Sequence, residues 1–404
     1  MNYSVFNLNK KLSPTNNNIK SILLLGGSGS VGKQTFALCI QHPNKYKIKA
    51  IISGKNITET IKQGLQAEPQ YIVMTDENSA IAVSEALKHL KTKVLYGHNA
   101  QIEIISQGYD VGITAIPGLV GLDLTLHTIK HCQIVAFANK ETIIYAGDLM
   151  LEYADKHNTC IIPIDSEHNS IFQLLNNSDN SRIKNITLTA SGGPLLNKQL
   201  SDIYNTSVEE VLKHPTWNMG QKITVDSATL FNKALEVVEA SYLFGLPIDN
   251  IKAVIHPESI VHGIAHLNDG SLLMHASCPD MMIPIAYALA WPYNSLIYKP
   301  LDLTIVQQLN FIEVEYERYP IFKLAINAAK EGVQSRIIMN YANEIAVRLF
   351  LNRQIKFGEI YKIVQFALDK LIFQQPEIDQ SDYISSVRNI CSIVEKIILY
   401  DYAL

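Results

Sequence analysis

The 404-residue chain has few cysteines, and they form neither a disulfide framework nor a metal-binding pattern. No two of them make a Cys-x-x-Cys pair, and they are scattered along the chain as Cys39, Cys132, Cys160, Cys278 and Cys391. A small secreted scaffold or a structural zinc site would need closely spaced cysteines. The sequence therefore predicts a reducing compartment, and we expect the protein to be cytoplasmic.

Long apolar runs and a strong excess of one charge are also missing. The longest apolar runs, such as IPIAYALAW, are about half of the roughly 20 residues that span a bilayer. The net charge of −4 gives no general attraction to nucleic acid or to an anionic membrane, so we expect neither as a partner. Residues 1–20 are polar and lack both arginine and the apolar core of a signal peptide, which predicts a flexible extension.

The composition, 47% apolar and 18% charged, is typical of a soluble enzyme with two or three domains. From residue 21 to about 163, apolar runs alternate with helical patterns. This alternation predicts a parallel sheet with helices on both faces. The strands are expected at 21–26, 47–52, 70–74, 93–95, 110–113, 133–137 and 159–164.

The pattern changes after this region. NITLTASGG and KAVIHPESIVHGIAHL are typical of strands, the latter compatible with an antiparallel sheet, whereas nearly everything from residue 320 onward has helical spacing. The fold class is therefore α/β in several parts. We expect a Rossmann-like dinucleotide-binding domain at 21–167, an α+β catalytic domain at 168–291, a connector at 292–319 and a helical domain at 320–404.

The stretch ILLLGGSGSVGKQTF places a glycine-rich turn between a strand and a helix. As Gly27-x-Gly29-x-x-Gly32 it matches the dinucleotide-binding fingerprint, and with Lys33 it also matches most of a P-loop. Gln34 stands where a P-loop needs the hydroxyl that ligates Mg²⁺, which favours a dinucleotide. A nucleoside triphosphate site, with the strand IIPID as its second element, and a purely structural turn remain the alternatives.

The end of the next strand favours NADP(H) over NAD(H). About 20 residues after the glycines, an NAD-binding unit usually carries an acid that bonds the ribose 2′-hydroxyl. Here the chain has Ser53, Gly54, Lys55 and Asn56 instead. No acid would repel a 2′-phosphate, and Lys55 could hold one, although a surface lysine in a turn would give the same pattern.

Two carboxylates follow the last expected strand, in PIDSEHNSIFQ. Asp165 and Glu167 are two residues apart, so at a strand end both would point to one face, where they repel each other unless a cation lies between them. Oxygen ligands suit Mg²⁺ or Mn²⁺. An exposed acidic turn, with Asp165 capping a helix, is the alternative.

A third carboxylate, Glu236, lies in DSATLFNKALEVVEASYLFG, which predicts one helix capped by Ser227 and running to about Phe244. The spacing places an apolar stripe on one face, made of Phe231, Leu235, Val238 and Tyr242. The opposite face carries Thr229, Asn232, Lys233 and Glu236. Such a face is usually solvated, but an amide, an ammonium and a carboxylate also suit a phosphorylated substrate and a metal.

Two further stretches are candidate binding loops. TASGGP offers Ser191 and backbone N–H groups after a strand, which could hold phosphate or form a plain turn. KHPTWNMGQK, within residues 211–222, combines His214, Trp217 and Gly220. It has the composition of a lid that covers a ligand, unless its tryptophan is packed into the core.

Eight motifs now occur in one order: GGSGSVG, GKN, ANKE, DSEHN, SGGP, HPTWNMG, DSATLFNKALE and PDMMIPIAYALAWP. In this the chain resembles the 1-deoxy-D-xylulose 5-phosphate reductoisomerase family, from about residue 20 to the C-terminal helices. The resemblance implies a homodimeric, NADPH-dependent oxidoreductase of the non-mevalonate route to isoprenoids. Its reaction would rearrange 1-deoxy-D-xylulose 5-phosphate and reduce it to 2-C-methyl-D-erythritol 4-phosphate. Another NADP-dependent sugar or semialdehyde dehydrogenase, a P-loop kinase and a non-catalytic regulator are the alternatives.

The resemblance also implies roles for individual residues. The divalent metal, Mg²⁺ or Mn²⁺ with Co²⁺ as a further candidate, would be bound by Asp165, Glu167 and Glu236, and Lys140 and His214 would complete the catalytic group. The substrate would also meet Ser166, Ser191, Ser227, Asn232, Lys233 and the lid residue Trp217. NADPH would meet Ser28, Gly29, Ser30, Val31, Gly54, Lys55, Asn56, Asn139, Glu141, Gly220 and Met281. The chain departs from the family pattern at Gly27, where serine is more typical, and at Met282, where arginine is common.

Overall fold

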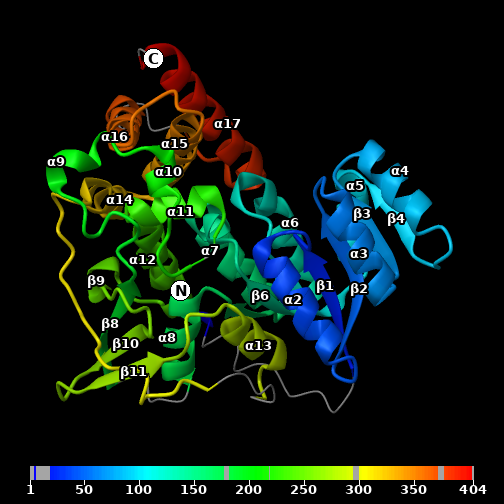
Figure 1. The fold of residues 1–404 in the computed structure, drawn as a ribbon. Helices are drawn as coiled ribbons and strands as arrows, with labels where there is room; N and C mark the ends of the chain where they lie inside the picture. Colours follow the sequence, from blue (N-terminus) through cyan, green and yellow to red (C-terminus); the bar gives the residue numbers. More distant parts are fainter. Residues whose placement is uncertain are drawn as a thin grey trace. The chain divides into compact units, whose positions relative to one another are not determined.

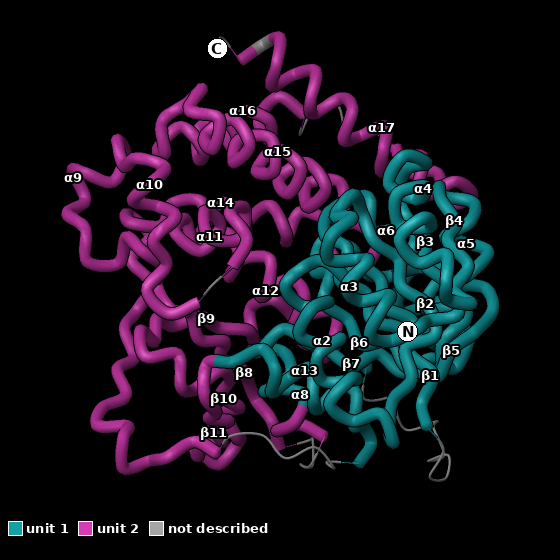
Figure 2. Tube along the Cα trace, turned by 45° about the vertical axis from the view of Figure 1, so that its right-hand side comes forward, with its two compact units in different colours: residues 1–143, 147–172, 280–299 teal, residues 144–146, 173–279, 300–404 magenta. Residues whose placement is uncertain are grey.

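The computed structural model describes residues 4–5, 19–176, 182–217, 219–293, 300–371 and 377–402. The chain forms two compact units (Figure 2). Unit 1 comprises residues 1–143, 147–172 and 280–299, and unit 2 comprises residues 144–146, 173–279 and 300–404. Most of the expected extension and residues 294–299 of the expected connector lie outside the described residues. The four domain boundaries drawn on sequence pattern stay a prediction.

Unit 1 is built on a seven-stranded sheet with the order β4-β3-β2-β1-β5-β6-β7, in which every neighbouring pair is parallel. Figure 1 shows β1 to β4 of this sheet in blue to cyan. The strands are β1 (Lys20–Leu25), β2 (Tyr46–Ser53), β3 (Tyr71–Met74), β4 (Lys93–Tyr96), β5 (Tyr109–Thr114), β6 (Cys132–Phe137) and β7 (Cys160–Pro163). All seven expected strands and their parallel arrangement are confirmed.

The strands were recognisable because both faces of the sheet are covered. Ile22, Leu23 and Leu24 in β1 are fully buried, as are Ile51 and Ile52 in β2. Parallel strands covered on both faces are continuous apolar runs rather than alternating ones. The helices that lie wholly or mostly in unit 1 are α2 (Ser30–Gln41), α3 (Ile57–Ala67), α4 (Glu77–Ala86), α5 (His98–Ile105), α6 (Gly118–His131), α7 (Lys140–His157), α8 (Ser166–Asn176) and α13 (Met282–Ala290).

The strand order of this sheet marks a binding crevice. β1 lies between β2 and β5, so the chain leaves β1 in one direction along the sheet and later returns to its other side. In open parallel sheets, ligands bind beyond the carboxyl ends of the strands at such a switch point. The glycine turn follows β1 at that edge, and the carboxyl ends of β2, β6 and β7 are followed by Gly54, Asn139 and Asp165.

Unit 2 contains a four-stranded sheet with the order β11-β10-β8-β9. β8 (Ile183–Ala190) is parallel to β9 (Ile251–Ile255), and β10 (Val261–Leu267) is antiparallel to β8 and to β11 (Leu272–Ala276). The antiparallel sheet expected for KAVIHPESIVHGIAHL is confirmed for its second half, β10, but its first half, β9, pairs in parallel with β8. β11 was not expected from the sequence. Between β8 and β9 lie the helices α9 (Leu200–Ile203), α10 (Val208–Val211), α11 (Gln221–Ala228) and α12 (Phe231–Phe244).

The C-terminal part of unit 2 is helical, as expected from the spacing of its apolar residues. It consists of α14 (Pro320–Glu331), α15 (Val333–Leu351), α16 (Glu359–Leu371) and α17 (Tyr383–Lys396). In α16 the buried residues recur at three and four positions, from Ile360 through Ile363, Val364 and Ala367 to Leu371. None of the described helices is long and apolar enough to cross a membrane.

One expectation about helix boundaries is wrong. The segment from Ser227 to Phe244 forms not one helix but parts of two, because Leu230 has a left-handed backbone with φ of 63°. Ser227 therefore lies inside the last turn of α11 instead of capping α12. The polar face of α12 is also not solvated, since Lys233 and Glu236 are 3% and 1% exposed.

Candidate functional site

The glycine turn of unit 1 leaves a helix N-terminus uncovered. Gly29 precedes α2 without any side-chain cap, and its own N–H donates to the Gly26 carbonyl at 2.9 Å. A Cβ at Gly32 would lie 2.2 Å from that same carbonyl oxygen, so no larger residue fits. The first-turn N–H groups of a helix have no partner within it and attract anions. Of the expected cofactor residues here, Gly29 and Ser30 are exposed and Ser28 and Val31 are half-buried.

The tip of β2 exposes the residues expected to select the cofactor. Gly54, Lys55 and Asn56 are all exposed. The Asn56 side-chain oxygen accepts a hydrogen bond from the Glu59 N–H at 3.1 Å and so caps α3. The acid nearest in sequence, Glu59, lies 3.5 Å from the Lys33 ammonium. Lys55 is therefore presented on a fixed turn at the cofactor edge of the sheet.

The start of α7 holds a buried amide with no internal partner. Asn139 follows β6 and is 1% exposed. Neither its Nδ2 nor its Oδ1 makes a hydrogen bond to any described residue. Since buried polar groups are normally paired, this orphaned amide fits a ligand group that completes it. The neighbouring Glu141 is also buried.

Asp165 and Glu167 lie close together, but not for the reason given by strand alternation. β7 already ends at Pro163, and Asp165 and Glu167 occupy the turn and the first turn of α8. One oxygen of each carboxylate lies within 4.8 Å of the other. The Lys140 ammonium is 2.6 Å from Asp165, and the Ser166 hydroxyl donates to Glu167 at 2.5 Å. The two carboxylates therefore offer oxygen ligands for a metal, and the Lys140 ammonium balances part of their negative charge.

A histidine that was not expected from the sequence lies beside this pair. His168 is fully buried, and its Nδ1 lies 4.0 Å from Asp165. The spacing of three residues across the start of α8 was the signal that could have found it, because residues three apart share a helix face.

Unit 2 brings three expected substrate residues together around one imidazole. The Nε2 atom of His214 is 3.1 Å from the Ser191 hydroxyl and 3.2 Å from the Ser227 hydroxyl. Its Nδ1 accepts hydrogen bonds from the backbone N–H groups of Thr216 at 3.2 Å and Trp217 at 2.9 Å. Nδ1 is therefore unprotonated and the proton of the neutral ring is on Nε2. Burial lowers the pKa of His214, which keeps the ring neutral near pH 7.

The loop that carries Ser191 is held tightly against α11. Gly192 and Gly193 have φ of 81° and 68°, in the left-handed region that favours glycine. A Cβ at Gly193 would lie 2.6 Å from the Ser227 carbonyl oxygen. The Gly193 N–H donates to the Ser191 hydroxyl at 3.2 Å. The loop backbone and the two serines therefore form one compact group of hydrogen-bond donors.

The start of α12 buries an ion pair. The Lys233 ammonium pairs with the Glu236 carboxylate, and Asn232 donates to the same carboxylate at 2.5 Å. Buried charges are stable only when they are paired and hydrogen-bonded. The sequence placed these three residues on one helix face, and in the structure Asn232 and Lys233 both donate to Glu236.

The remaining expected site residues are less constrained. Trp217 is half-buried and meets the His262 ring edge-on, with ring centroids 6.3 Å apart, so it is neither fully exposed nor a core residue. Gly220 is exposed before α11, and Met281 is half-buried before α13. Asn218, in the middle of the expected lid, lies outside the described residues.

Three family models match the chain. Residues 22–147 match a model described as 1-deoxy-D-xylulose 5-phosphate reductoisomerase. Residues 161–244 and 276–396 match two models described as C-terminal domains of the same family. Together they span most of both units.

Individual proteins are similar over nearly the whole length. A 1-deoxy-D-xylulose 5-phosphate reductoisomerase of Pelodictyon phaeoclathratiforme is 40% identical over 350 residues, covering 86% of this chain and 91% of its own. A crystal structure of DOX-P reductoisomerase in complex with NADPH, fosmidomycin and magnesium superposes with a TM-score of 0.88 at 37% identity, covering 94% of this chain and 98% of its own. The enzyme of Zymomonas mobilis in complex with NADPH gives 0.86 at 33% identity, with the same two coverages.

Proposed function

The chain belongs to the 1-deoxy-D-xylulose 5-phosphate reductoisomerase family, and we propose how its own residues carry out the reaction of that family. It is an NADPH- and divalent-metal-dependent oxidoreductase. It rearranges 1-deoxy-D-xylulose 5-phosphate and reduces it to 2-C-methyl-D-erythritol 4-phosphate, in the non-mevalonate route to isoprenoids. The observation that carries our assignment of residues is the convergence of Ser191, Ser227 and a neutral His214, a group of donors suited to a phosphate.

Unit 1 would bind NADPH at the carboxyl edge of its sheet. The uncovered N-terminus of α2 suits the pyrophosphate, with Ser28, Gly29, Ser30 and Val31 around it. The tip of β2 suits the 2′-phosphate, with Gly54, Lys55 and Asn56 exposed. The orphaned amide of Asn139 would be completed by the bound cofactor. Glu141, Gly220 and Met281 are assigned to the same ligand on the strength of the family resemblance alone.

Asp165, Glu167 and Glu236 would hold the divalent metal. The first two offer carboxylate oxygens within 4.8 Å of each other, and all three donors are hard oxygens, which suit Mg²⁺ or Mn²⁺, with Co²⁺ as a further candidate. When bound, such a cation polarises the substrate carbonyl and an adjacent hydroxyl, worth roughly several kcal/mol in the transition state. Lys140 orients Asp165 through its 2.6 Å contact.

The substrate phosphate would lie against the donors of unit 2. Because His214 receives two backbone hydrogen bonds on Nδ1, its Nε2–H is fixed as a donor. The hydroxyls of Ser191 and Ser227 can rotate toward a phosphate oxygen without moving their backbones. Ser166, Asn232 and Lys233 are assigned to the substrate hydroxyls. In this arrangement the protein orients the sugar phosphate while carbon–carbon bond cleavage and hydride transfer take place.

Coupled NADPH consumption tests this assignment directly. Loss of the reduced-nicotinamide absorbance should require both 1-deoxy-D-xylulose 5-phosphate and Mg²⁺ or Mn²⁺. Consumption with a simple aldehyde but not with this substrate would instead support a general NADP-dependent dehydrogenase. ATP hydrolysis without NADPH binding would support the P-loop alternative.

Lys55→Ala should narrow the preference for NADPH over NADH by about tenfold or more, because a charge-assisted phosphate contact is worth about 1.5–3 kcal/mol. The measurement is kcat/KM for each cofactor. Lys62→Ala, which removes another exposed lysine from the following helix α3, is the matched control and should leave the ratio unchanged. A wild-type protein that used both cofactors equally would contradict the assignment of Lys55.

Trp217→Ala should raise KM for the sugar phosphate and lower kcat while the melting temperature changes little, because Trp217 is only half-buried. A lid that excludes water is lost, but no core cavity is created. The control is Trp291→Ala at the other tryptophan, which is 6% exposed and should lose about 3–5 kcal/mol of stability. A comparable loss of stability in Trp217→Ala would identify a core residue instead of a lid.

We further propose that the protein is a homodimer formed along β11. This strand is an edge of its sheet, and its three large apolar residues Leu272, Leu273 and Met274 are 46%, 36% and 44% exposed. An exposed apolar edge strand with unpaired backbone groups is a liability in a monomer and is normally covered. A second copy of the same strand would cover it symmetrically.

Leu273→Lys should convert the dimer to a monomer, measured by sedimentation equilibrium. A charge placed on an apolar strand edge opposes pairing with a second copy. Ile81→Lys changes an isoleucine that is 61% exposed on α4 and should leave the oligomeric state unchanged. A wild-type protein that is monomeric at micromolar concentration would exclude this interface.

A cytoplasmic location also belongs to the proposal. All five cysteines are free thiols, and four of them are buried. Burial raises the pKa of Cys39, Cys132, Cys160 and Cys391 to about 12, which keeps these thiols unreactive. Free, protected thiols are typical of proteins in a reducing compartment.

A further inference from the structure

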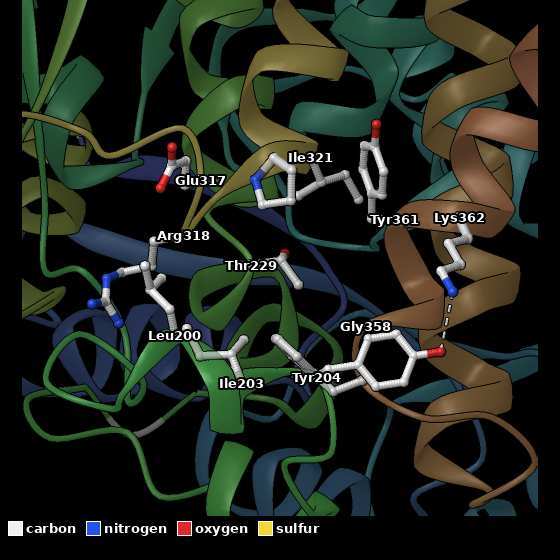
Figure 3. A pocket seen from close by; sticks show the side chains of 12 residues that line it. Leu200, Ile203, Tyr204, Thr229, Glu317, Arg318, Ile321, Gly358, Tyr361 and Lys362 are labelled. Carbon is white, nitrogen blue, oxygen red and sulfur yellow. Dashed lines mark hydrogen bonds between the residues drawn. The ribbon is translucent and has the colours of Figure 1, made fainter.

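A pocket of about 420 Å³ opens in unit 2, and none of its lining side chains has a role in the reaction proposed above. That volume lies within the range of about 300–1,000 Å³ that holds small molecules. The wall is largely apolar, with Leu200, Ile203, Ile321 and Phe357 among its residues. Figure 3 shows Arg318 and Lys362 on opposite sides of Leu200, Ile203 and Ile321.

The aromatic wall of the pocket is rigidly placed and carries a cation. The Tyr204 ring packs on Gly358, where a Cβ would lie 2.0 Å from the ring, and the Gly358 N–H donates to the Tyr204 carbonyl at 3.1 Å. The Lys362 ammonium donates to the Tyr204 hydroxyl at 3.3 Å. Within the described part of the chain this is the one hydrogen bond that the Lys362 ammonium makes. An ammonium has three N–H donors, so two remain for a ligand.

The opposite side of the pocket is formed by Arg318, which has N–H donors that its hydrogen bonds to the described residues do not use. Nη1 of Arg318 donates to the carbonyls of Leu195 at 3.2 Å and Lys198 at 2.6 Å, and Nε contacts Glu315 at 3.3 Å. Its Nη2 makes no hydrogen bond to the residues that the structure describes. Glu317 is the one acid among the lining residues, so the lining is net positive. An apolar cavity with positive groups on two sides suits a small organic anion with an apolar body.

The same wall supports the loop that carries Ser191. Arg318 holds the carbonyls of Leu195 and Lys198, which follow that loop, and the Tyr319 hydroxyl donates to the Gly192 carbonyl at 2.9 Å. A ligand anion that drew the Arg318 guanidinium toward itself would weaken its bonds to these carbonyls. The loop would then lose part of what fixes its position.

We propose that this pocket binds a small amphipathic anion, a carboxylate, sulfonate or phosphate on an apolar body, and that its occupation weakens substrate binding through Arg318. The proposal of a binding site depends only on the geometry and charge of the pocket. The coupling rests on the proposed role of Ser191, His214 and Ser227 as ligands of the substrate phosphate.

Fluorescence titration with anilinonaphthalene sulfonate tests the binding site, because this probe combines an aromatic body with one sulfonate. The full-length protein should bind it saturably, and Lys362→Glu should raise its Kd at least about tenfold. Ile203→Trp, which fills the apolar part of the pocket, should abolish this saturable binding of the probe. Lys370→Glu changes another exposed lysine of α16, outside the pocket, and should leave Kd unchanged. Equal probe affinity in all four proteins would overturn the proposal.

Steady-state kinetics at saturating probe test the coupling. KM for 1-deoxy-D-xylulose 5-phosphate should rise about fivefold or more while KM for NADPH stays constant, and Lys362→Glu should abolish the rise. An unchanged substrate KM with a filled pocket would overturn the coupling. A protein that binds the probe as expected but does not turn over this substrate would refute the reaction and leave the pocket assignment supported.

Discussion

Glu236→Gln should lower turnover at least about 10²-fold, equivalent to roughly 2.7 kcal/mol in the transition state. Glutamine keeps the size and shape of the side chain but removes one anionic oxygen, so a bound divalent cation would be held more weakly and would polarise the substrate less. NADPH affinity, measured by fluorescence, should be nearly unchanged because the glycine turn and the tip of β2 lie in unit 1. The primary measurement is kcat across a titration of Mg²⁺ or Mn²⁺.

Because Glu236 belongs to a buried ion pair, this test needs a stability control. Lys233 would face a neutral partner in the variant, so a stability measurement must accompany the kinetics. Glu210→Gln is the matched control, since Glu210 also pairs with a lysine, Lys198 at 2.8 Å, but at the surface. It should keep full turnover. EDTA should abolish wild-type activity, and added metal should restore it. Normal kcat in Glu236→Gln, or full turnover in EDTA, would refute metal assistance.

The fold of unit 1 could be predicted because its sequence signals are local. Each strand is a short apolar run bounded by polar residues, and all of the runs except the edge strand β4 are largely enclosed by the sheet and its helices, as Ile22 and Ile52 show. The glycine turn was recognisable for a similar reason, since Gly32 lies where any Cβ would collide with backbone.

The unpredicted features depend on contacts between residues far apart in sequence or on one unusual backbone conformation. Leu230 breaks a segment whose apolar spacing is continuous, and nothing in that spacing marks its left-handed φ. β11 was missed because its apolar residues face solvent and do not alternate with polar ones. Asp165 and Glu167 do lie close together, but the start of a helix brings them together and not strand geometry.

The candidate site, too, could be predicted only in part from the sequence. Residue types and motifs identified Ser191, His214 and Ser227, but not the hydrogen bonds that determine their chemistry. The tautomer of His214 follows from two backbone N–H groups, which only the folded loop places on Nδ1. The sequence could therefore supply the members of the site, whereas the protonation state of its histidine needed the structure.

Gly193→Ala should lower kcat/KM for the sugar phosphate by about 10²-fold, because a displacement of about 1 Å in a positioning group can cost that much. The Cβ of alanine would lie 2.6 Å from the Ser227 carbonyl oxygen, so the loop and α11 must move apart. That movement would separate Ser191 and Ser227, which now lie 3.1 and 3.2 Å from the same His214 nitrogen. NADPH affinity should remain at the wild-type value.

Gly270→Ala distinguishes this steric effect from simple backbone strain. Gly270 has φ of 88°, also left-handed, but a Cβ there would meet no atom within 4 Å. Both variants should therefore lose about 1–2 kcal/mol of stability from the left-handed backbone. Only Gly193→Ala should also lose substrate affinity, because only there does the added methyl group displace Ser191 and Ser227, the proposed donors to the substrate phosphate. Equal kinetics in the two variants would mean that the Ser191 loop does not hold the substrate.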